Sequence, residues 1–186
     1  MQILVSFAPW IVYAILESTV SWTLSLAGAL AVTLAVLAYK YRSAQPVDFL
    51  SIGGVVFFVV MLAASPLLGQ GTVEAYTQTL SHGWIALLMW GSIAARTPFT
   101  EVFARGEAPA EMIDTPEFLR FNCIISAMWA ASFTVGTAVL VVLQWNGVDS
   151  GTFVVIAASI AVPIVAMKRY IDSVTADDEM QEAVSA

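Results

Sequence analysis

The stretch WTLSLAGALAVTLAVLAY, residues 22–39, decides the fold class, because it carries no charged residue over a length that can cross a bilayer. At 1.5 Å per residue, about 20 helical residues span the ~30 Å hydrocarbon core of a membrane. Backbone groups surrounded by lipid must form their hydrogen bonds within their own segment. The stretch is therefore predicted to be a transmembrane helix.

The composition of the whole chain agrees with this prediction. The protein has 186 residues, of which 59% are hydrophobic and only 11% are charged, and its mean hydropathy is +0.83. Soluble domains carry roughly 25% charged residues. A soluble chain of this length could not bury several wholly apolar helices. We expect an all-α, polytopic membrane helix bundle with about six transmembrane helices.

The expected spans lie near residues 2–19, 21–39, 49–68, 75–95, 118–144 and 152–170. They form one transmembrane domain over residues 1–171, followed by an acidic tail, residues 172–186, that is expected to be disordered. The first span is short, so a signal peptide is the alternative. A signal peptide would begin with basic residues, and no Lys or Arg precedes Lys40, which favours a span.

The basic residues predict the orientation of the bundle. With six crossings, all seven Lys and Arg residues fall on one side: Lys40, Arg42, Arg96, Arg105, Arg120, Lys168 and Arg169. The turns on the other side hold only acids, namely Glu17, Glu74 and Asp149. Short loops rich in Lys and Arg face the cytoplasm. We therefore expect a multi-pass protein of the cell inner membrane with both termini in the cytoplasm.

Charge and residue counts narrow the function classes. The formal net charge is −7, which argues against nucleic acid as a partner and against a polybasic lipid anchor. One cysteine and one histidine allow no intrachain disulfide and disfavour a protein-held metal or haem. No nucleophile–base set or phosphate-binding loop is visible. We expect a non-enzymatic protein without cofactor, whose partners are the bilayer and other membrane proteins or further copies of itself.

A charged segment, RTPFTEVFARGEAPAEMIDTPEFLRFN at residues 96–122, interrupts the apolar blocks. Thr97-Pro98 can cap and start a helix, and Glu101 and Arg105 are spaced to pair along it. Gly106 is placed to end it. The segment is thus predicted to form a short amphipathic helix of roughly two turns at the membrane interface, between spans four and five.

Two interpretations of this charged segment stay open. Its candidate interaction residues, Arg96, Glu101, Arg105 and Arg120, would form a cytoplasmic docking surface. Alternatively, they belong to a solvated connector whose long side chains reach toward water. Further along, Asp114 is expected to cap the fifth span, with Glu117 completing a capping box.

Glu17 and His82 form a candidate polar pair near the outer ends of spans one and four. If these spans adjoin, the two side chains could form a proton-linked pair at the outward mouth of a small transporter or channel. The alternative is that His82 is an interfacial side chain wetted on one side.

The order of short motifs resembles that of the intracellular septation protein A type of small bacterial inner-membrane protein. The resembling pieces are FAPWIVYAILES (7–18), AYKYR (38–42), RTPF (96–99), APAEMIDTPEF (108–118) and Asn122 with Trp129. The Asn-to-Trp spacing is longer here than in that family, and the loops carry fewer lysines. An uncharacterised bacterial multi-pass membrane family with a Pro-Phe-Thr loop motif is similar too.

This resemblance implies a non-enzymatic envelope protein that works through contacts with the cell-division or wall-synthesis machinery. It supplies no catalytic residues. Two other functions remain open from the sequence: a small transporter or channel, and an accessory subunit of a larger membrane complex.

Overall fold

A computed structural model of the protein describes residues 2–148 and 150–185, with side chains described for residues 5–148 and 150–176. Over these ranges the chain is almost entirely helical, and no strand occurs in them. The expected all-α class is confirmed.

The helices are α1 (Gln2–Glu17), α2 (Trp22–Arg42), α3 (Phe49–Leu68), α4 (Gln70–Ala94), α5 (Glu101–Ala104), α6 (Pro116–Trp145) and α7 (Thr152–Ser185). Every expected span corresponds to one long helix. The α4 helix starts before residue 75, and α7 continues past residue 170 to Ser185.

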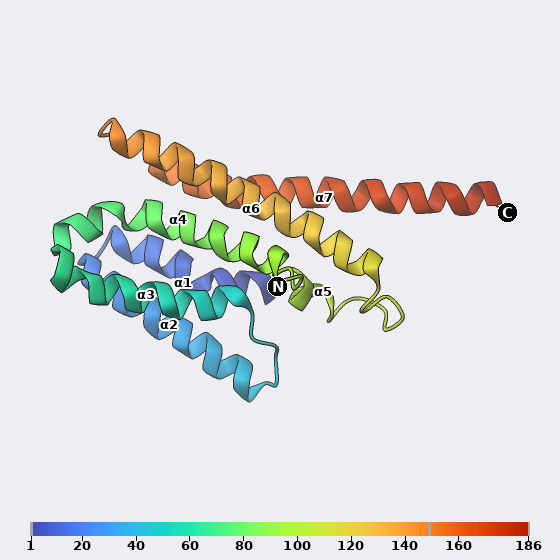
Figure 1. Cartoon of the computed structure of the whole chain (residues 1–186), viewed down its shortest axis with the longest axis horizontal. Coiled ribbons are helices and arrows are strands. Elements are labelled where there is room, and N and C mark those ends of the chain that lie inside the picture. Colours follow the sequence, from blue (N-terminus) through green and yellow to red (C-terminus); the bar gives the residue numbers. More distant parts are fainter. Residues whose placement is uncertain (1, 149, 186) are drawn as a thin grey trace.

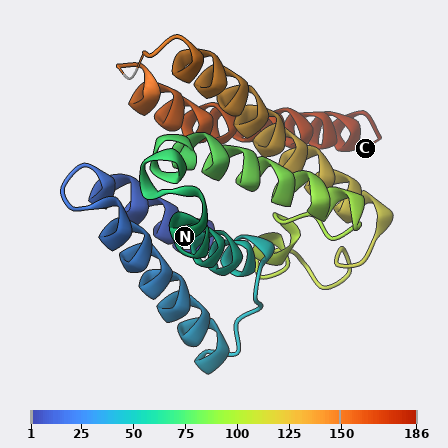
Figure 2. The same ribbon diagram turned by 60° about the vertical axis from the view of Figure 1, so that its left-hand side comes forward.

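Consecutive long helices pack against one another, and α1 also contacts α3. Figure 1 shows that the turns α1–α2, α3–α4 and α6–α7 lie at one end of the bundle, the turn end. The connections 43–48 and 95–115 lie at the other, the loop end, toward which both chain termini point; the turned view in Figure 2 agrees. Up-and-down helices joined in this way place alternate connections at opposite ends.

The interior between α1, α3, α4 and α6 is filled by aromatic side chains. The indole of Trp10 lies 5.1 Å from the ring of Phe57 and 5.0 Å from that of Phe58, centroid to centroid. Phe7 stacks on Trp129 at 5.5 Å. Aromatic pairs at these separations contribute beyond their buried area. They fix α1 inside the bundle.

Four helices are long and apolar enough to cross a membrane: α2, α3, α6 and the part Thr152–Ala176 of α7. The α1 helix is apolar but shorter, and α4 carries polar residues in its first half. The outward faces are apolar, as a lipid-facing surface requires: 79% of Phe153 is exposed, and Val154 and Val162 beside it are also exposed. The bundle is therefore of the membrane type.

The segment after α4 differs from its prediction. The expected two-turn interfacial helix is a single turn, α5, which starts at Glu101 instead of Pro98. Thr97 does not cap it, because Pro98, Phe99 and Thr100 turn inward and are buried. The ring of Phe99 meets Trp129 edge-on at 6.2 Å. Burial of this segment in the bundle thus replaces the expected amphipathic helix.

The cap of α6 also differs from the prediction. Thr115, one residue after the expected cap Asp114, accepts a hydrogen bond from the amide of Phe118 at 3.1 Å, and Pro116 follows at the first helical position. Asp114 has a left-handed backbone, φ 72°, which a short polar residue tolerates better than most. Its side chain is used elsewhere, as described below.

Candidate functional site

Buried hydrogen bonds hold the connection between α4 and α6 against the bundle. The hydroxyl of Thr100 lies 2.9 Å from that of Ser126 and 3.1 Å from Oδ1 of Asn122. The amide of Phe99 donates to the hydroxyl of Ser92 at 3.1 Å. Asn122 and Ser126 of α6 thus bind the loop rather than another long helix. A loop fixed in this way has a defined surface.

On that surface, Arg105 is held by two carboxylates. Its guanidinium lies 2.7 Å from Oε1 of Glu101, which confirms the predicted pair, and 2.5 Å from Oδ1 of Asp114. The hydrogen bonds that it donates to Asp114 and Glu101 raise the pKa of the Arg105 guanidinium above its ordinary value. The left-handed backbone of Asp114 therefore serves to close this clasp.

The other two candidate arginines are exposed. Arg96 and Arg120 form no hydrogen bond or ion pair with the described residues. Arg120 lines an open groove of about 750 Å³ between the connection, the start of α6 and the middle of α7, where Phe121 stacks on Tyr170 at 5.6 Å. Of the four candidates, the structure brings only Glu101 and Arg105 into contact.

A second polar cluster, absent from the sequence analysis, lies buried at the loop end. The ammonium of Lys40 forms an ion pair with Asp48, and both side chains are almost fully buried. The hydroxyls of Ser6 and Ser51 donate to Oδ2 of Asp48 at 3.0 and 2.9 Å, and the amide of Ser51 donates to Oδ1 at 2.9 Å. Lys40 also lies 6.0 Å from the ring centroid of Phe103.

Burial alone would raise the pKa of the Asp48 carboxyl. The hydrogen bond and charge of Lys40, with the Ser51 amide, outweigh burial and hold this pKa below its ordinary value. A sequence signal existed: an aspartate directly before an apolar block, with serine three residues on, is typical of a helix N-cap. The sequence analysis treated Lys40 only as a boundary cation.

At the turn end, the carboxylate of Glu17 is bound within the bundle. It accepts hydrogen bonds from the hydroxyl of Tyr13, at 3.0 Å, and from the side-chain amide of Gln78. Nearby, the carbonyl oxygen of Gln144 accepts a hydrogen bond from Thr79 at 3.0 Å. These contacts tie the ends of α1, α4 and α6 together.

His82 does not pair with Glu17. It lies one turn further along α4 than Gln78, with only 5% of the residue exposed, against the ring of Phe133 at 5.2 Å. Neither ring nitrogen has a hydrogen-bond partner, although the Gln78 carbonyl lies near the ring. His82 is thus buried among the helices rather than on the outer surface of the bundle.

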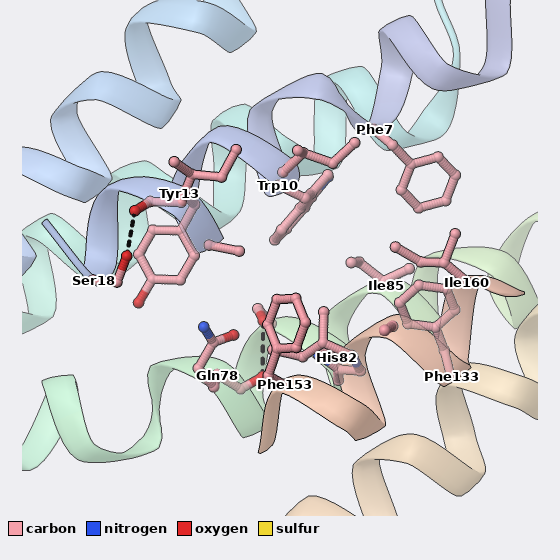
Figure 3. A pocket seen from close by; sticks show the side chains of 16 residues that line it. Phe7, Trp10, Tyr13, Ser18, Gln78, His82, Ile85, Phe133, Phe153 and Ile160 are labelled. Atoms are coloured by element: carbon pink, nitrogen blue, oxygen red, sulfur yellow. Dashed lines mark hydrogen bonds between the residues drawn. The ribbon is translucent and has the colours of Figure 1, made fainter. Parts of the chain in front are cut away.

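His82 lines a cavity of about 490 Å³ between α1, α4 and α7, with Phe133 of α6 at its side. Figure 3 shows Phe7, Trp10 and Tyr13 projecting from α1, His82 and Ile85 from α4, and Phe153 and Ile160 from α7. The walls are mainly aromatic and aliphatic. The bundle interior is thus packed on one side of α1 and hollow on the other.

No family model, curated protein sequence or solved structure matches the chain. The resemblance to septation protein A therefore stays a prediction. Fold and surface together define the class as a membrane-type helix bundle, with an ordered loop at one end and an apolar cavity in its side.

Proposed function

We propose that the protein is a six-span inner-membrane protein that acts without catalysis, by binding other membrane proteins at its loop end. The observation that carries this proposal is that the connection 95–115 is held in one defined conformation. Buried hydrogen bonds of Thr100 and the clasp on Arg105 fix a segment that could have been a loose tether. Ordered loops on a rigid scaffold often carry function, and a preformed surface loses less entropy on binding.

The charges of this surface favour a protein partner over a lipid surface. Arg105 is neutralised by Glu101 and Asp114. The remaining exposed charges of this surface are two arginines, Arg96 and Arg120, and three carboxylates, those of Glu107, Glu111 and Glu117. Anionic lipid attracts clusters of basic residues, and this surface is mixed. A protein segment with charges of both signs would complement it, with apolar side chains in the groove beside Arg120.

Six crossings with the loop end in the cytoplasm accommodate all seven cations on one side. Lys40 lies beside the ring of Phe103, and Phe103 is two residues before Arg105 in the chain. Lys40 and Arg105 therefore lie at the same end of the bundle. A role in envelope maintenance or septation, and membership of a larger complex, are compatible with this proposal. Transport through Glu17 and His82 is not proposed, because the two side chains do not contact each other.

Site-specific photocrosslinking in native membranes tests the proposal. A photoreactive residue at Met112, whose side chain is half exposed, should give a discrete protein adduct. The variant Arg96→Asn with Arg120→Gln should lose most of that adduct; asparagine suits the left-handed backbone of residue 96, φ 57°.

The matched control neutralises two other cations, Lys168→Gln with Arg169→Gln, which lie on α7 outside the connection. It should leave the adduct at the wild-type level. Equal adduct yield in all three proteins, or only lipid adducts at Met112, would contradict the proposed protein contact.

A further inference from the structure

The cavity beside α1 contains polar groups that the fold leaves without partners. Both ring nitrogens of His82 are buried and unbonded, and so is the indole nitrogen of Trp10, which also lines the cavity. A buried polar group without a hydrogen bond costs roughly 1–3 kcal/mol. Native proteins keep few such groups, and a titratable one within a membrane span is a functional candidate by default.

The packing around His82 prevents it from finding a partner elsewhere. A Cβ at Gly136 of α6 would lie 3.5 Å from Cδ2 of His82, and Phe133 covers the ring from the same helix. Within the cavity wall, the side chain of Gln78 is committed to Glu17, and the hydroxyl of Ser81 donates to the Gln78 carbonyl. The Gln78 carbonyl near the ring thus already accepts a hydrogen bond, and a molecule in the cavity that His82 lines could supply the missing partner.

The side of this cavity between α1 and α7 is bordered by apolar helix faces. The α7 helix packs along α6, and most of the residues in its apolar part, within Thr152–Ala176, are not buried. The seam between α1 and α7 is bordered by Ile11, Ile15 and Phe153, all partly exposed apolar side chains. At the turn end, the hydrogen bonds of Tyr13 and Gln78 to Glu17 tie α1 to α4.

We propose that this cavity binds a lipid-soluble molecule that enters between α1 and α7 and places a carbonyl oxygen on the ring N–H of His82. The indole N–H of Trp10 is a donor only, so an acceptor oxygen suits both orphaned groups. Ligand cavities of about 300–1,000 Å³ with mainly apolar walls and a few polar groups are typical for small organic molecules. This proposal is independent of the loop end.

Two probes of matched shape test it on the full-length protein in detergent: fluorenone, which has a carbonyl, and fluorene, which has a methylene at that position. The preference for fluorenone is the Kd of fluorene divided by the Kd of fluorenone. This preference should be about fivefold to tenfold larger in the wild type than in His82→Phe, as expected for one hydrogen bond. This comparison cancels any difference in how the probes partition into the micelle.

A spectroscopic readout comes from the single histidine of the chain. With ¹⁵N-labelled histidine, only His82 reports, and its ring nitrogens should shift on adding fluorenone but hardly on adding fluorene. In Ala157→Phe and Ile156→Trp, which fill the cavity, saturable binding of both probes should be lost. Unchanged nitrogen shifts, equal probe ratios in wild type and His82→Phe, or full binding by the folded filled variants would overturn the proposal.

A carbonyl can come from a membrane phospholipid or from a free lipid-soluble molecule. Native mass spectrometry separates these sources. Displacement of a retained phospholipid by fluorenone would identify the ester carbonyl of a lipid as the natural acceptor. Fluorenone binding to a protein that retains no phospholipid would identify a free molecule.

Discussion

Lys40 and Asp48 form a buried ion pair that joins the end of α2 to the start of α3, and the hydroxyl of Ser6 ties α1 to the same carboxylate. The helices α1, α2 and α3 are thus connected through the Lys40–Asp48 ion pair. Such a pair is no proof of stability by itself, because taking both charges out of water is expensive. Its members depend on each other, and this dependence can be measured.

We expect Asp48→Asn or Lys40→Met alone to lower the free energy of unfolding by about 3–5 kcal/mol, because each leaves the other polar group buried without its counter-charge. The double variant Lys40→Met with Asp48→Asn should cost clearly less than the sum of the two single variants. A double-mutant cycle on the detergent-solubilised protein, followed by thermal or denaturant unfolding, gives the coupling. Additive effects would mean that the two residues act independently.

The same pair predicts an acid dependence of stability. The pKa of Asp48 is lowered in the fold by Lys40 and Ser51 against the effect of burial. The contribution of the Asp48 carboxylate to the free energy of unfolding is therefore fully present above the ordinary carboxyl pKa, about 4. It is lost as the pH falls through the lower pKa that Asp48 has in the folded protein. Thermal midpoints measured as a function of pH should show this loss in the wild type. In Asp48→Asn the corresponding part of the loss should be absent.

At the C-terminal ends of α2 and α6, two substitutions should change the free energy of unfolding in opposite directions. Ala44 and Gly147 both have left-handed backbones, φ 50° and 65°, one residue before the amides that close α2 and α6. Ala44→Gly should raise the free energy of unfolding by about 0.5–1 kcal/mol, and Gly147→Ala should lower it by about 1 kcal/mol. Shifts of the same sign in both variants would argue against this backbone effect.

The anchoring of the loop depends on the hydroxyl of Thr100, which contacts Asn122 and Ser126. Thr100→Val keeps the shape and should cost about 1–3 kcal/mol, since the partners lose their hydrogen bonds. Thr100→Ser keeps the hydroxyl and should recover most of that loss. Proteolysis within 105–112 should be faster in the valine variant than in the serine variant. Equal behaviour of the two would remove the role assigned to the hydroxyl.

Six crossings predict a specific labelling pattern. In a Cys123→Ala background, single cysteines at Arg42 and Glu111 should react with impermeant maleimide only from the cytoplasmic side. Cysteines at Thr19 and Gln70 should react only from the opposite side. All four positions are exposed in the fold. Reaction of Arg42→Cys and Glu111→Cys from opposite sides would rule out the proposed arrangement.

The helices could be predicted from sequence because the backbone of every apolar block in hydrocarbon must form its hydrogen bonds within its own segment. The α3 helix begins and ends at the predicted residues, 49 and 68. The polar start of α4, near Gln70, was missed, because a helix end that leaves the apolar region has no hydropathy signal. The capping residue of α6 was placed one position early, since Asp114 and Thr115 are both good caps.

The sites were harder to predict because they depend on which helices adjoin. Nothing local distinguishes Lys40, which is buried beside Asp48, from Arg42, which is exposed two residues later. Phe99 lies within the segment expected to form an amphipathic helix, and only the positions of Ser92 and Trp129 explain why it turns inward. Similarly, the surroundings of His82 come from α6 and α7 rather than from Glu17.

Each long helix packs against the long helix synthesised just before it, and α7 rests on α6. A chain with such sequential contacts can assemble in the order of its translation, each hairpin closing before the next helix leaves the ribosome. The wall that Phe153 and Ile160 contribute comes from the final helix. In that order of assembly, the hollow beside His82 is completed last, when α7 packs on α6.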